Sequence, residues 1–434
     1  MRPTDRPGRW YDAITRYQWL VFVIASAGWV FDVFEGQLFT IFKTPALLDL
    51  LGYATTAASD PRVASAVDQQ ANVATAFFLL GGAAGGLVFG IVADRVGRIR
   101  ALSLTILTYS LFSALTFFAQ AVWQMHALRF LVALGTGGEW AIAAALVAET
   151  FPTRARALAS GSFHASSVLG VAIAALMGRV LKDPGSWRWG FLLGLAPALL
   201  ILWIRMSLRE PEDWAAARRQ ALAGQKLGDL GELLGDRRWN TRAWLGLGLA
   251  AVGLSSYWSI FAWVPELVVD TLGPSVPIAT RRATASSAYL MMNCTGGLLG
   301  LLSFAPVAAW KGRRLAFAVY HLGAIVMVPV TCFGSRSYEA TLWLLPVMGF
   351  FVLGMHAGYA IYLPELFPTR LRATGASFCF NVGRLASGAV LLIRSAIRDH
   401  LTLRQSLVAM SSLFLVGLAL LIFAPETRGQ SLPE

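Results

Sequence analysis

Charged residues are scarce in this sequence. Asp, Glu, Lys and Arg make up 14% of its 434 residues, and apolar residues make up 56%, whereas a soluble domain usually contains about 25% charged residues. The mean hydropathy of +0.60 is correspondingly high. This composition excludes a water-soluble enzyme of this size.

Cysteines and the common catalytic motifs are also scarce. Cys294, Cys332 and Cys379 each fall inside an apolar run. This pattern is typical of neither a disulfide framework nor a metal site. The sequence has no Gly-Lys-Ser/Thr phosphate loop, which excludes an ATP-driven motor. It has no His and Cys cluster with metal-ligand spacing and no evident Ser-His-Asp order. We therefore expect no enzyme activity, no cofactor and no metal.

Long apolar runs dominate what is present. A membrane-spanning helix needs about 20 apolar residues, and the first run, near Trp19, is interrupted by Asp32 and Glu35, so we expect a retained helix rather than a signal peptide. Twelve such spans are predicted, and the longest polar gap, 207–242, separates six from six. The predicted spans are 19–42, 71–93, 101–119, 123–149, 157–178, 188–206, 243–266, 284–309, 315–333, 338–366, 373–395 and 404–424.

Basic residues alternate between the two sides of the predicted spans. The net charge of +12 would suggest nucleic acid in a soluble protein, but here the basic residues lie between apolar runs. With the N-terminus placed in the cytoplasm, 23 of the 36 Lys and Arg are cytoplasmic, 11 are outside, and the remaining two, Arg129 and Arg384, lie within spans. Cytoplasmic loops of membrane proteins carry such an excess. We expect both termini in the cytoplasm, contact with membrane lipids and no nucleic-acid partner.

An internal repeat divides the chain into two halves. AETFPTRARA at 148–157 and PELFPTRLRA at 364–373 share seven of ten residues at an offset of 216, and Gly97-Arg98 matches Gly312-Arg313 at an offset of 215. Parallel six-helix repeats are one known transporter architecture. We predict an N-terminal half at 1–206, a central cytoplasmic loop at 207–242 and a C-terminal half at 243–434.

Several motifs carry a resemblance to the major facilitator superfamily. GIVADRVGR at 90–98 resembles its loop between helices 2 and 3, RFLVALGTGGEW at 129–140 resembles its glycine-rich helix 4, and PETRGQSL at 425–432 resembles the tail of sugar porters. The resemblance covers nearly the whole chain. It implies an all-α membrane protein with twelve transmembrane helices in two pseudo-symmetric six-helix halves, which is the major facilitator fold.

Within that superfamily, Asp32-Val33-Phe34-Glu35 is similar to the Asp-Gly-aromatic-Asp motif of aromatic acid:proton symporters. Val33 and Glu35 depart from that motif, but the acidic spacing remains. The segment 364–384 also resembles helices 10 and 11 of organic-acid and niacin-type carriers. The resemblance implies that the helix 4 and helix 11 arginines, here Arg129 and Arg384, take part in transport.

Three acids are candidates for proton coupling. Asp32 and Glu35 lie three residues apart in the first span, and Glu139 lies in the fourth. An acid at the bilayer centre costs about 2.5–3.5 kcal/mol, and desolvation favours its protonated form. The alternative for Asp32 and Glu35 is a structural ion pair with an arginine, and Glu139 could instead be the counter-ion of Arg384.

Several polar and aromatic residues are candidates for substrate binding. Arg384 presents a planar fork that matches a carboxylate, and the alternative for it is an internal ion pair. For Arg129 the alternative is a salt bridge to Asp32 or Glu35. The aromatic candidates could equally be packing residues. The predicted substrate-binding residues are Arg384, Arg129, Asn381, Tyr359, His356 and Tyr257.

Charged residues at the cytoplasmic ends of spans 2, 4 and 10 suggest a gate. We expect an inter-half network, with inside-positive anchoring as the alternative, and an asymmetric one because the C-terminal half has no acid matching Asp94. The predicted gate residues are Gly90, Asp94, Arg95, Gly97, Arg98, Glu149, Arg154, Arg156, Glu365, Arg370 and Arg372.

These features predict a secondary transporter of the cell inner membrane. We expect a monomer that takes up a small organic anion, aromatic or another carboxylate, together with protons, by alternating access. A sugar or polyol carrier and a proton-driven exporter of drugs or cations remain alternatives. A transport-inactive sensor or scaffold would be supported by a long soluble domain, which this length does not accommodate.

Overall fold

The computed structural model describes residue 11 and residues 14–54, 60–181, 183–388 and 400–434. Its regular elements within these ranges are helices. Eleven helical segments are long and apolar enough to cross a membrane. The predicted all-helical membrane fold is therefore confirmed.

The first six spans are formed by eight helices. Two spans are broken into two helices each, α5 with α6 and α7 with α8. The bounds are α1 Arg16–Leu50, α2 Pro61–Val96, α3 Arg98–Thr116, α4 Val122–Thr150, α5 Thr153–Ala165, α6 Ser167–Val180, α7 Trp187–Leu193 and α8 Ala198–Ser207.

The remaining spans follow a short helical segment. The bounds are α9 Glu212–Leu222, α10 Leu230–Gly235, α11 Arg237–Leu272, α12 Ile278–Met292, the π-helical turn η3 Asn293–Gly297, α13 Leu298–Lys311, α14 Arg313–Gly334, α15 Tyr338–Gly354, α16 His356–Glu365, α17 Arg372–Ser377, the π-helical turn η5 Phe378–Val382, α19 Leu403–Ser411 and α20 Leu413–Phe423. The predicted span 373–395 is helical over 372–388, and its last residues lie outside the described ranges.

The segment predicted as a loop at 207–242 is partly helical. It contains α9 and α10, and α11 begins at Arg237 rather than at 243. Asp236 explains the earlier start, because its carboxylate accepts hydrogen bonds from the amides of Arg238 and Trp239 and so caps the helix. The membrane span of α11 is thus extended by polar turns at one end.

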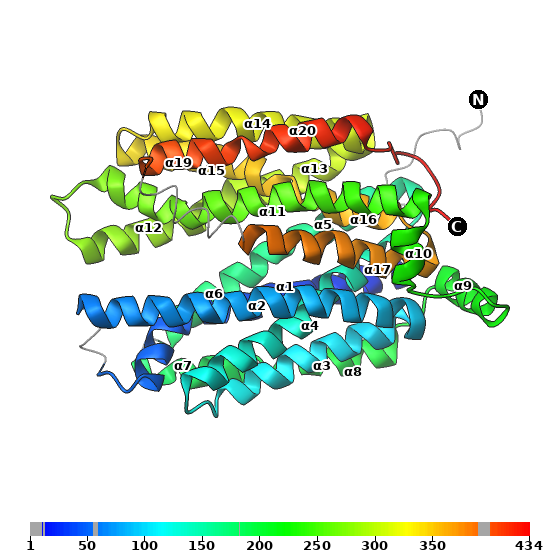
Figure 1. The fold of residues 1–434 in the computed structure, drawn as a ribbon, viewed down its shortest axis with the longest axis horizontal. Helices are drawn as coiled ribbons and strands as arrows, with labels where there is room; N and C mark the ends of the chain where they lie inside the picture. The colour runs from blue at the N-terminus through cyan, green and yellow to red at the C-terminus, as the bar shows by residue number, and fades with distance from the viewer. Residues whose placement is uncertain (1–10, 12–13, 55–59, 182, 389–399) are drawn as a thin grey trace.

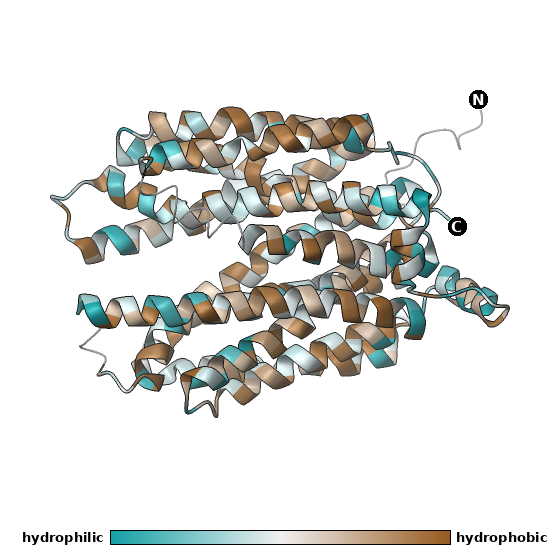
Figure 2. Cartoon of the chain, viewed as in Figure 1, coloured by the Kyte–Doolittle hydropathy of each residue, from teal (hydrophilic) through white to brown (hydrophobic). Residues whose placement is uncertain are grey.

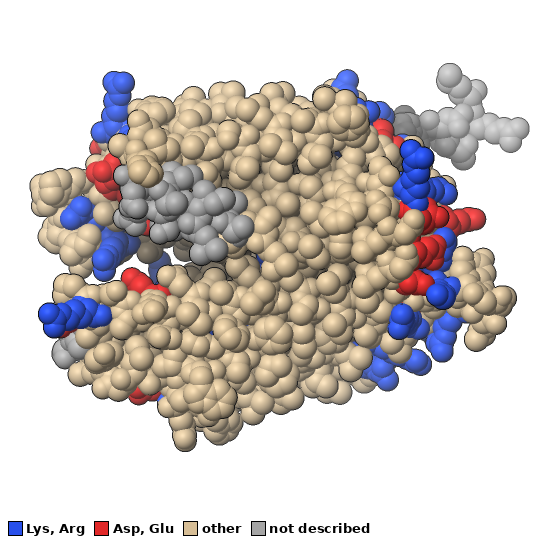
Figure 3. Space-filling model, in the orientation of Figure 1, with Lys and Arg blue, Asp and Glu red and all other residues tan. Residues whose placement is uncertain are grey.

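The helices form two bundles that lie side by side (Figure 1). One bundle contains α1 to α8 and the other α11 to α20. Apolar residues cover the sides of both bundles (Figure 2), whereas Lys, Arg, Asp and Glu gather at the two ends (Figure 3). An apolar belt between two charged ends is what a bilayer requires of a spanning protein.

The two bundles meet more closely at one end than at the other. Helix α17 contacts α2 and α4, and α13 and α16 contact α5. These contacts lie toward the end where α2 joins α3 (Figure 1). At the opposite end, where α2 and α12 begin, Figure 3 shows an opening between the bundles.

Glycines on α2 make this close approach possible. Gly81 and Gly85 lie against the backbone of α4, at Phe130 and Leu134, while Gly86 and Gly90 lie against Asn381 and Ser377 of the other bundle. Small residues let membrane helices approach closely. Helix α2 therefore packs closely against both its own bundle and the other one.

Candidate functional site

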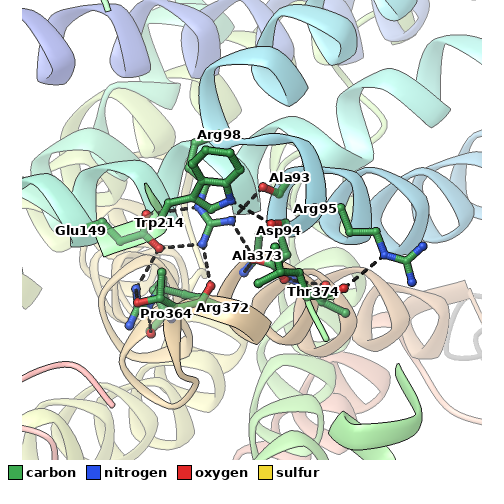
Figure 4. Close-up of polar contacts among 12 residues, drawn as sticks. Ala93, Asp94, Arg95, Arg98, Glu149, Trp214, Pro364, Arg372, Ala373 and Thr374 are labelled. Atoms are coloured by element: carbon green, nitrogen blue, oxygen red, sulfur yellow. Dashed lines mark hydrogen bonds and ion pairs between the residues drawn. The ribbon is translucent and has the colours of Figure 1, made fainter. Parts of the chain in front are cut away.

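Arg98 is the centre of a buried charge cluster where α2 joins α3. Its guanidinium donates to Asp94 at 2.7 Å, to Glu149 at 2.7 and 3.1 Å, and to the carbonyl of Thr369 at 2.8 Å. Arg372 of α17 donates to the same Glu149 at 2.8 Å. We call Asp94, Arg98, Glu149 and Arg372 the junction network (Figure 4).

Asp94 joins the two bundles directly. Its carboxylate accepts hydrogen bonds from the amides of Ala373 and Thr374, at 3.2 and 2.9 Å, and from the Thr374 hydroxyl at 2.6 Å. Asp94 is fully buried, so these bonds and Arg98 offset the desolvation of its charge. Leaving one member of such a cluster unpaired costs roughly 3–5 kcal/mol.

Other predicted gate residues lie outside the junction network. Arg95 points away from it and donates to the carbonyl of Leu227 (Figure 4). Arg370 forms its ion pair with Glu232 of α10 at 2.7 Å. Arg154 is exposed, and Arg156 donates to the backbone carbonyls of Ala148 and Gln430. The sequence could not show which of the predicted gate residues belong to the network, because residues that are neighbours on the same short loop can contact different elements.

The second bundle contains a matching pair. Arg313 donates to Glu365 at 2.8 and 3.0 Å, and Thr427 donates to the same carboxylate at 2.6 Å. Sequence reasoning missed Arg313 as a site residue, although its match to Arg98 in the repeat was a usable signal. As expected, the described part of the second bundle has no acid that corresponds to Asp94 beside this pair.

Two further acids, also missed, cap the helices behind these arginines. Glu210 accepts from the amides of Ile99 and Arg100 at the start of α3, and Glu426 accepts from those of Arg313 and Arg314 at the start of α14. Burial raises the pKa of the Glu210 carboxyl, against the lowering effect of these amides. Both acids lie in short segments that follow the sixth and twelfth spans, so the repeat extends beyond the helices.

Asp32 and Arg384 face each other between the bundles. Asp32 is 8% exposed, and the two charges are close enough to interact electrostatically. They form no ion pair within 4.0 Å, and Nε of Arg384 has no hydrogen-bond partner among the described residues. An arginine in this state can still receive a carboxylate.

Glu35 and Arg129 lie inside the first bundle. Glu35 is fully buried and Arg129 is 3% exposed. The Arg129 guanidinium lies over the rings of Phe78 and Phe39, at 4.1 and 4.8 Å from their centroids. The expected alternative, a salt bridge from Arg129 to Asp32 or Glu35, is not formed within 4.0 Å in the described part of the chain.

Glu139 is also fully buried in the first bundle. Its carboxylate is packed against Gly28 of α1, one turn from Asp32. Neither of its oxygens has a hydrogen-bond partner among residues that the structure describes, and it makes no ion pair with Arg384 there. Three acids of one bundle are therefore buried in the same region without counter-ions in hydrogen-bond contact.

The aromatic candidates divide into two groups. Tyr257 and His356 are in edge contact, 5.0 Å between ring centroids, and Nε2 of His356 has no partner among described residues. Tyr359 instead donates to the carbonyl of Leu249 at 2.9 Å and is fully buried, as expected of a packing residue. Asn381 donates to the carbonyl of Gly137 at 2.9 Å and so bridges the bundles.

An aromatic contact across the bundles was missed by sequence reasoning. Trp140 of α4 stacks on Phe380 of η5, with 3.8 Å between centroids. Its indole donates to Nδ1 of His164 at 2.9 Å. This contact and the Asn381 bond hold the two bundles together next to Asp32 and Arg384.

The arrangement favours binding and release rather than bond chemistry. It offers a half-buried arginine, buried acids that can exchange protons, and charge clusters that join two bundles. In the described residues no group of three His, Cys, Asp or Glu side chains could hold a metal ion.

Comparisons with known proteins agree with this architecture. The model of the Major Facilitator Superfamily matches residues 19–391. The chain is 30% identical over 432 residues to the probable 4-methylmuconolactone transporter of Cupriavidus pinatubonensis, covering 97% of this chain and 93% of that protein. It is 28% identical over 322 residues to the cis,cis-muconate transport protein of Acinetobacter baylyi, covering 73% and 76%.

Solved structures show the same fold. The proton:xylose symporter XylE, bound to 6-bromo-6-deoxy-D-glucose, aligns with a TM-score of 0.75 and 16% identity over 96% of this chain and 98% of that one. At this identity the likeness concerns the fold alone. The family match covers most of the chain, so this chain belongs to the Major Facilitator Superfamily and is a multi-pass membrane transporter of small molecules rather than an enzyme.

Proposed function

We propose that this transporter imports a small organic anion together with protons. The observation that carries the proposal is the pair formed by Asp32 and Arg384, which face each other between the bundles without closing an ion pair. Arg384 binds the substrate carboxylate, because its fork matches that group and stays charged. We assign Asn381, His356 and Tyr257 to the same site as further substrate contacts, since Asn381 bonds across the bundles to Gly137 and Tyr257 contacts His356.

The relatives support an organic acid as the substrate. Muconate carries two carboxylates and a muconolactone carries one, so a carboxylate is the group that both named compounds share. Muconate contains a conjugated diene and a muconolactone contains an unsaturated lactone ring, and such groups can pack against an aromatic side chain such as Phe380, whose ring centroid lies 5.6 Å from the Arg384 guanidinium. We propose an aromatic or similarly conjugated carboxylate as the substrate of this chain.

Asp32 couples the proton to the anion. When the substrate carboxylate binds Arg384, Asp32 loses the neighbouring positive charge, and a carboxylate without a counter-charge in a low-dielectric site takes up a proton. Proton and anion thus favour each other's binding, with a coupling of a few kcal/mol being sufficient. Glu35 and Glu139 are further proton carriers.

The junction network is the cytoplasmic gate in this proposal. It closes one end of the bundle interface while Figure 3 shows the opposite end open, as alternating access requires. The excess of basic residues supports a cytoplasmic location for this end, both termini and the segment 207–242. The chain acts as a monomer in the cell inner membrane, with its basic end in contact with anionic lipids.

Uptake into proteoliposomes tests the proposal. The purified chain is given labelled cis,cis-muconate, benzoate, xylose and a lipophilic cation, each with and without an inward proton gradient. We expect gradient-driven accumulation of at least one of the two acids and not of xylose or the cation. Accumulation of xylose alone, or expulsion of the cation, would contradict the proposal.

A further inference from the structure

We propose that the hydroxyl of Tyr109 is a relay between the buried acids of the first bundle, passing a proton between Asp32, Glu139 and Glu35. The inference rests on the proposed proton coupling, and it assigns a proton-transfer role to a residue of α3 that no motif indicated. It turns three alternative proton sites into one connected set.

Tyr109 is placed for this role by close helix packing. Its side chain is fully buried. Gly135 of α4 lies directly against the backbone of Tyr109, and Glu139 follows Gly135 by about one helical turn. The phenol therefore projects into the layer between α3, α4 and α1.

The Tyr109 hydroxyl faces all three acids. It interacts electrostatically with Glu139, Asp32 and Glu35. It is directed at the Glu139 carboxylate, although this contact is longer or less well aligned than a normal hydrogen bond. A buried hydroxyl usually has a partner. Tyr109 is fully buried, and its hydroxyl has no partner of normal hydrogen-bond geometry among the described residues although three carboxyls interact with it. We explain this by hydrogen-bond partners that change as the acids gain or lose protons.

The surrounding elements limit which charges can take part. Helix α1 contributes Asp32 and Glu35, and α4 contributes Glu139 and Arg129, of which Arg129 interacts with Glu35. From the other bundle Arg384 reaches Asp32. Helices α7 and α8 also contact α3, and there Gly194 lies against Ser113 and Glu35, which adds a neutral hydroxyl.

The relay step balances without any further reactant. A protonated carboxyl donates its proton to the Tyr109 oxygen while the Tyr109 hydroxyl proton passes to a second, ionised carboxylate. One O–H bond breaks and one forms at the tyrosine, so the phenol is neutral before and after. The net result moves one proton from Asp32, at the bundle interface, to Glu139 or Glu35, which are buried inside the first bundle.

Tyr109→Phe removes the hydroxyl and keeps the ring. Because that hydroxyl makes no hydrogen bond to described residues, we expect the variant to fold. The matched control is Tyr320→Phe, a buried tyrosine of the other bundle whose hydroxyl bonds Gly300 and Ser303 far from these acids.

In proteoliposomes we expect Tyr109→Phe to retain exchange of labelled for unlabelled cis,cis-muconate within about twofold, while accumulation driven by a proton gradient falls at least about tenfold. Tyr320→Phe should keep both. Equal retention of both activities by Tyr109→Phe, or equal loss of both, would overturn the relay. Absence of gradient-driven uptake by the unaltered protein would instead reject the proposed coupling.

A second measurement does not depend on transport. Infrared difference spectra of the full chain in detergent report the carbonyl stretch of protonated carboxyls as pH rises. The relay predicts that Tyr109→Phe shifts this band or the pH at which it is lost, and that Tyr320→Phe does not. An unchanged band and titration in Tyr109→Phe would overturn the inference.

Discussion

At the scale of residues, the acids in the middle of the first bundle are buried without closed ion pairs to other described residues. Glu35 and Glu139 are fully buried, and Arg129 is nearly so. Each acid at the bilayer centre costs about 2.5–3.5 kcal/mol, and a closed ion pair with an arginine would offset this cost in a purely structural role. Because the acids and arginines are not paired with each other, we infer that the acids are stabilised by protonation and the arginines by a bound anion at different steps of transport.

The position of Arg384 depends on the absence of a side chain at Gly82. A Cβ at Gly82 would lie 3.2 Å from Nη1 of Arg384, so Gly82→Ala displaces the guanidinium by a few tenths of an ångström. We expect the apparent affinity for the transported acid to weaken by about threefold to tenfold, roughly 1 kcal/mol. Competition of unlabelled acid in the exchange assay measures it.

Gly36→Ala is the matched control for Gly82→Ala. Gly36 also lies in a membrane helix of the first bundle, but nothing lies within 4 Å of a Cβ placed there. We expect its affinity to match that of the unaltered protein. Equal affinity in both variants would show that Gly82 does not position Arg384.

Residue identities were predicted from the sequence more completely than residue contacts. Asp32, Arg384 and Glu139 stand out because charge is rare in apolar runs. Tyr109 does not stand out, since a tyrosine in a membrane helix is ordinary and its hydroxyl acquires meaning only from acids on α1 and α4. Arg95 was grouped with Arg98, and Arg370 with Arg372, by proximity in sequence, but Arg95 and Arg370 instead contact the segment around α10.

At the scale of elements, the ends of α3 and α14 are held by acids from distant segments. Gly97 and Gly312 precede these helices with φ of +115° and +105°, a region that favours glycine. A Cβ at Gly97 would collide with Glu210. The same joint, a glycine with an acid behind it, therefore occurs once in each bundle.

Gly97→Ala tests this joint. Positive φ costs a residue with a Cβ about 1–2 kcal/mol, and displacement of Glu210 adds the loss of a helix cap, about 0.5–2 kcal/mol. Gly224→Ala is the control, because Gly224 has φ of +109° with open space around it. Thermal unfolding in detergent should show a clearly larger decrease in Tm for Gly97→Ala, and equal decreases would contradict the Glu210 contact.

Asp94 determines how firmly α2 holds α17. Asp94→Asn keeps the size of the side chain but replaces charge-assisted bonds, worth about 1.5–3 kcal/mol each, to Arg98 and Thr374. We expect normal insertion and Tm within a few degrees, but exchange slowed about tenfold or more. Asp60→Asn, which retains a helix cap at the opposite end, should exchange at the normal rate.

An Asp94→Asn protein that exchanges as fast as the unaltered one would remove Asp94 from the conformational cycle. If Asp94→Asn and Asp60→Asn were slowed equally, the effect would not belong to the junction network either. The measurement is the initial rate of exchange at saturating substrate, with the amount of inserted protein determined in parallel.

Most spans were predictable because each is an apolar run of sufficient length, and the observed helices contain the predicted cores. The breaks between α5 and α6 and between α7 and α8, and the π-helical turns η3 and η5, were not predicted. They depend on tertiary packing, as at Gly296, which lies against the backbone of Pro346. Apolar periodicity does not report such contacts.

At the scale of the molecule, the two bundles and the apolar belt define a spanning protein with two different ends. We expect the end with α9, α10 and the C-terminal residues to face the cytoplasm. In a variant without the native cysteines, Cys introduced at Lys226 should resist a membrane-impermeant maleimide in intact cells. Cys introduced at Arg336, exposed in the turn between α14 and α15, should react.

Reaction at position 226 and protection at position 336 would reverse the orientation. The mechanism would then have its gate on the outer side, and the direction of proton-driven transport would need to be inverted. Reaction of both positions only after the cells are opened would contradict the placement of the α14–α15 turn outside the membrane.

Whether Asp32 couples the proton to the anion is decided by transport of the Asp32→Asn variant in proteoliposomes. The amide resembles the protonated carboxyl but cannot release a proton. We expect that Asp32→Asn no longer accumulates labelled cis,cis-muconate under an inward proton gradient, while exchange at equal pH persists within about tenfold. Arg384→Ala should lose both, because it removes the anion site. Accumulation by Asp32→Asn against its substrate gradient, at a level near that of the unaltered protein, would show that Asp32 is not the coupling acid.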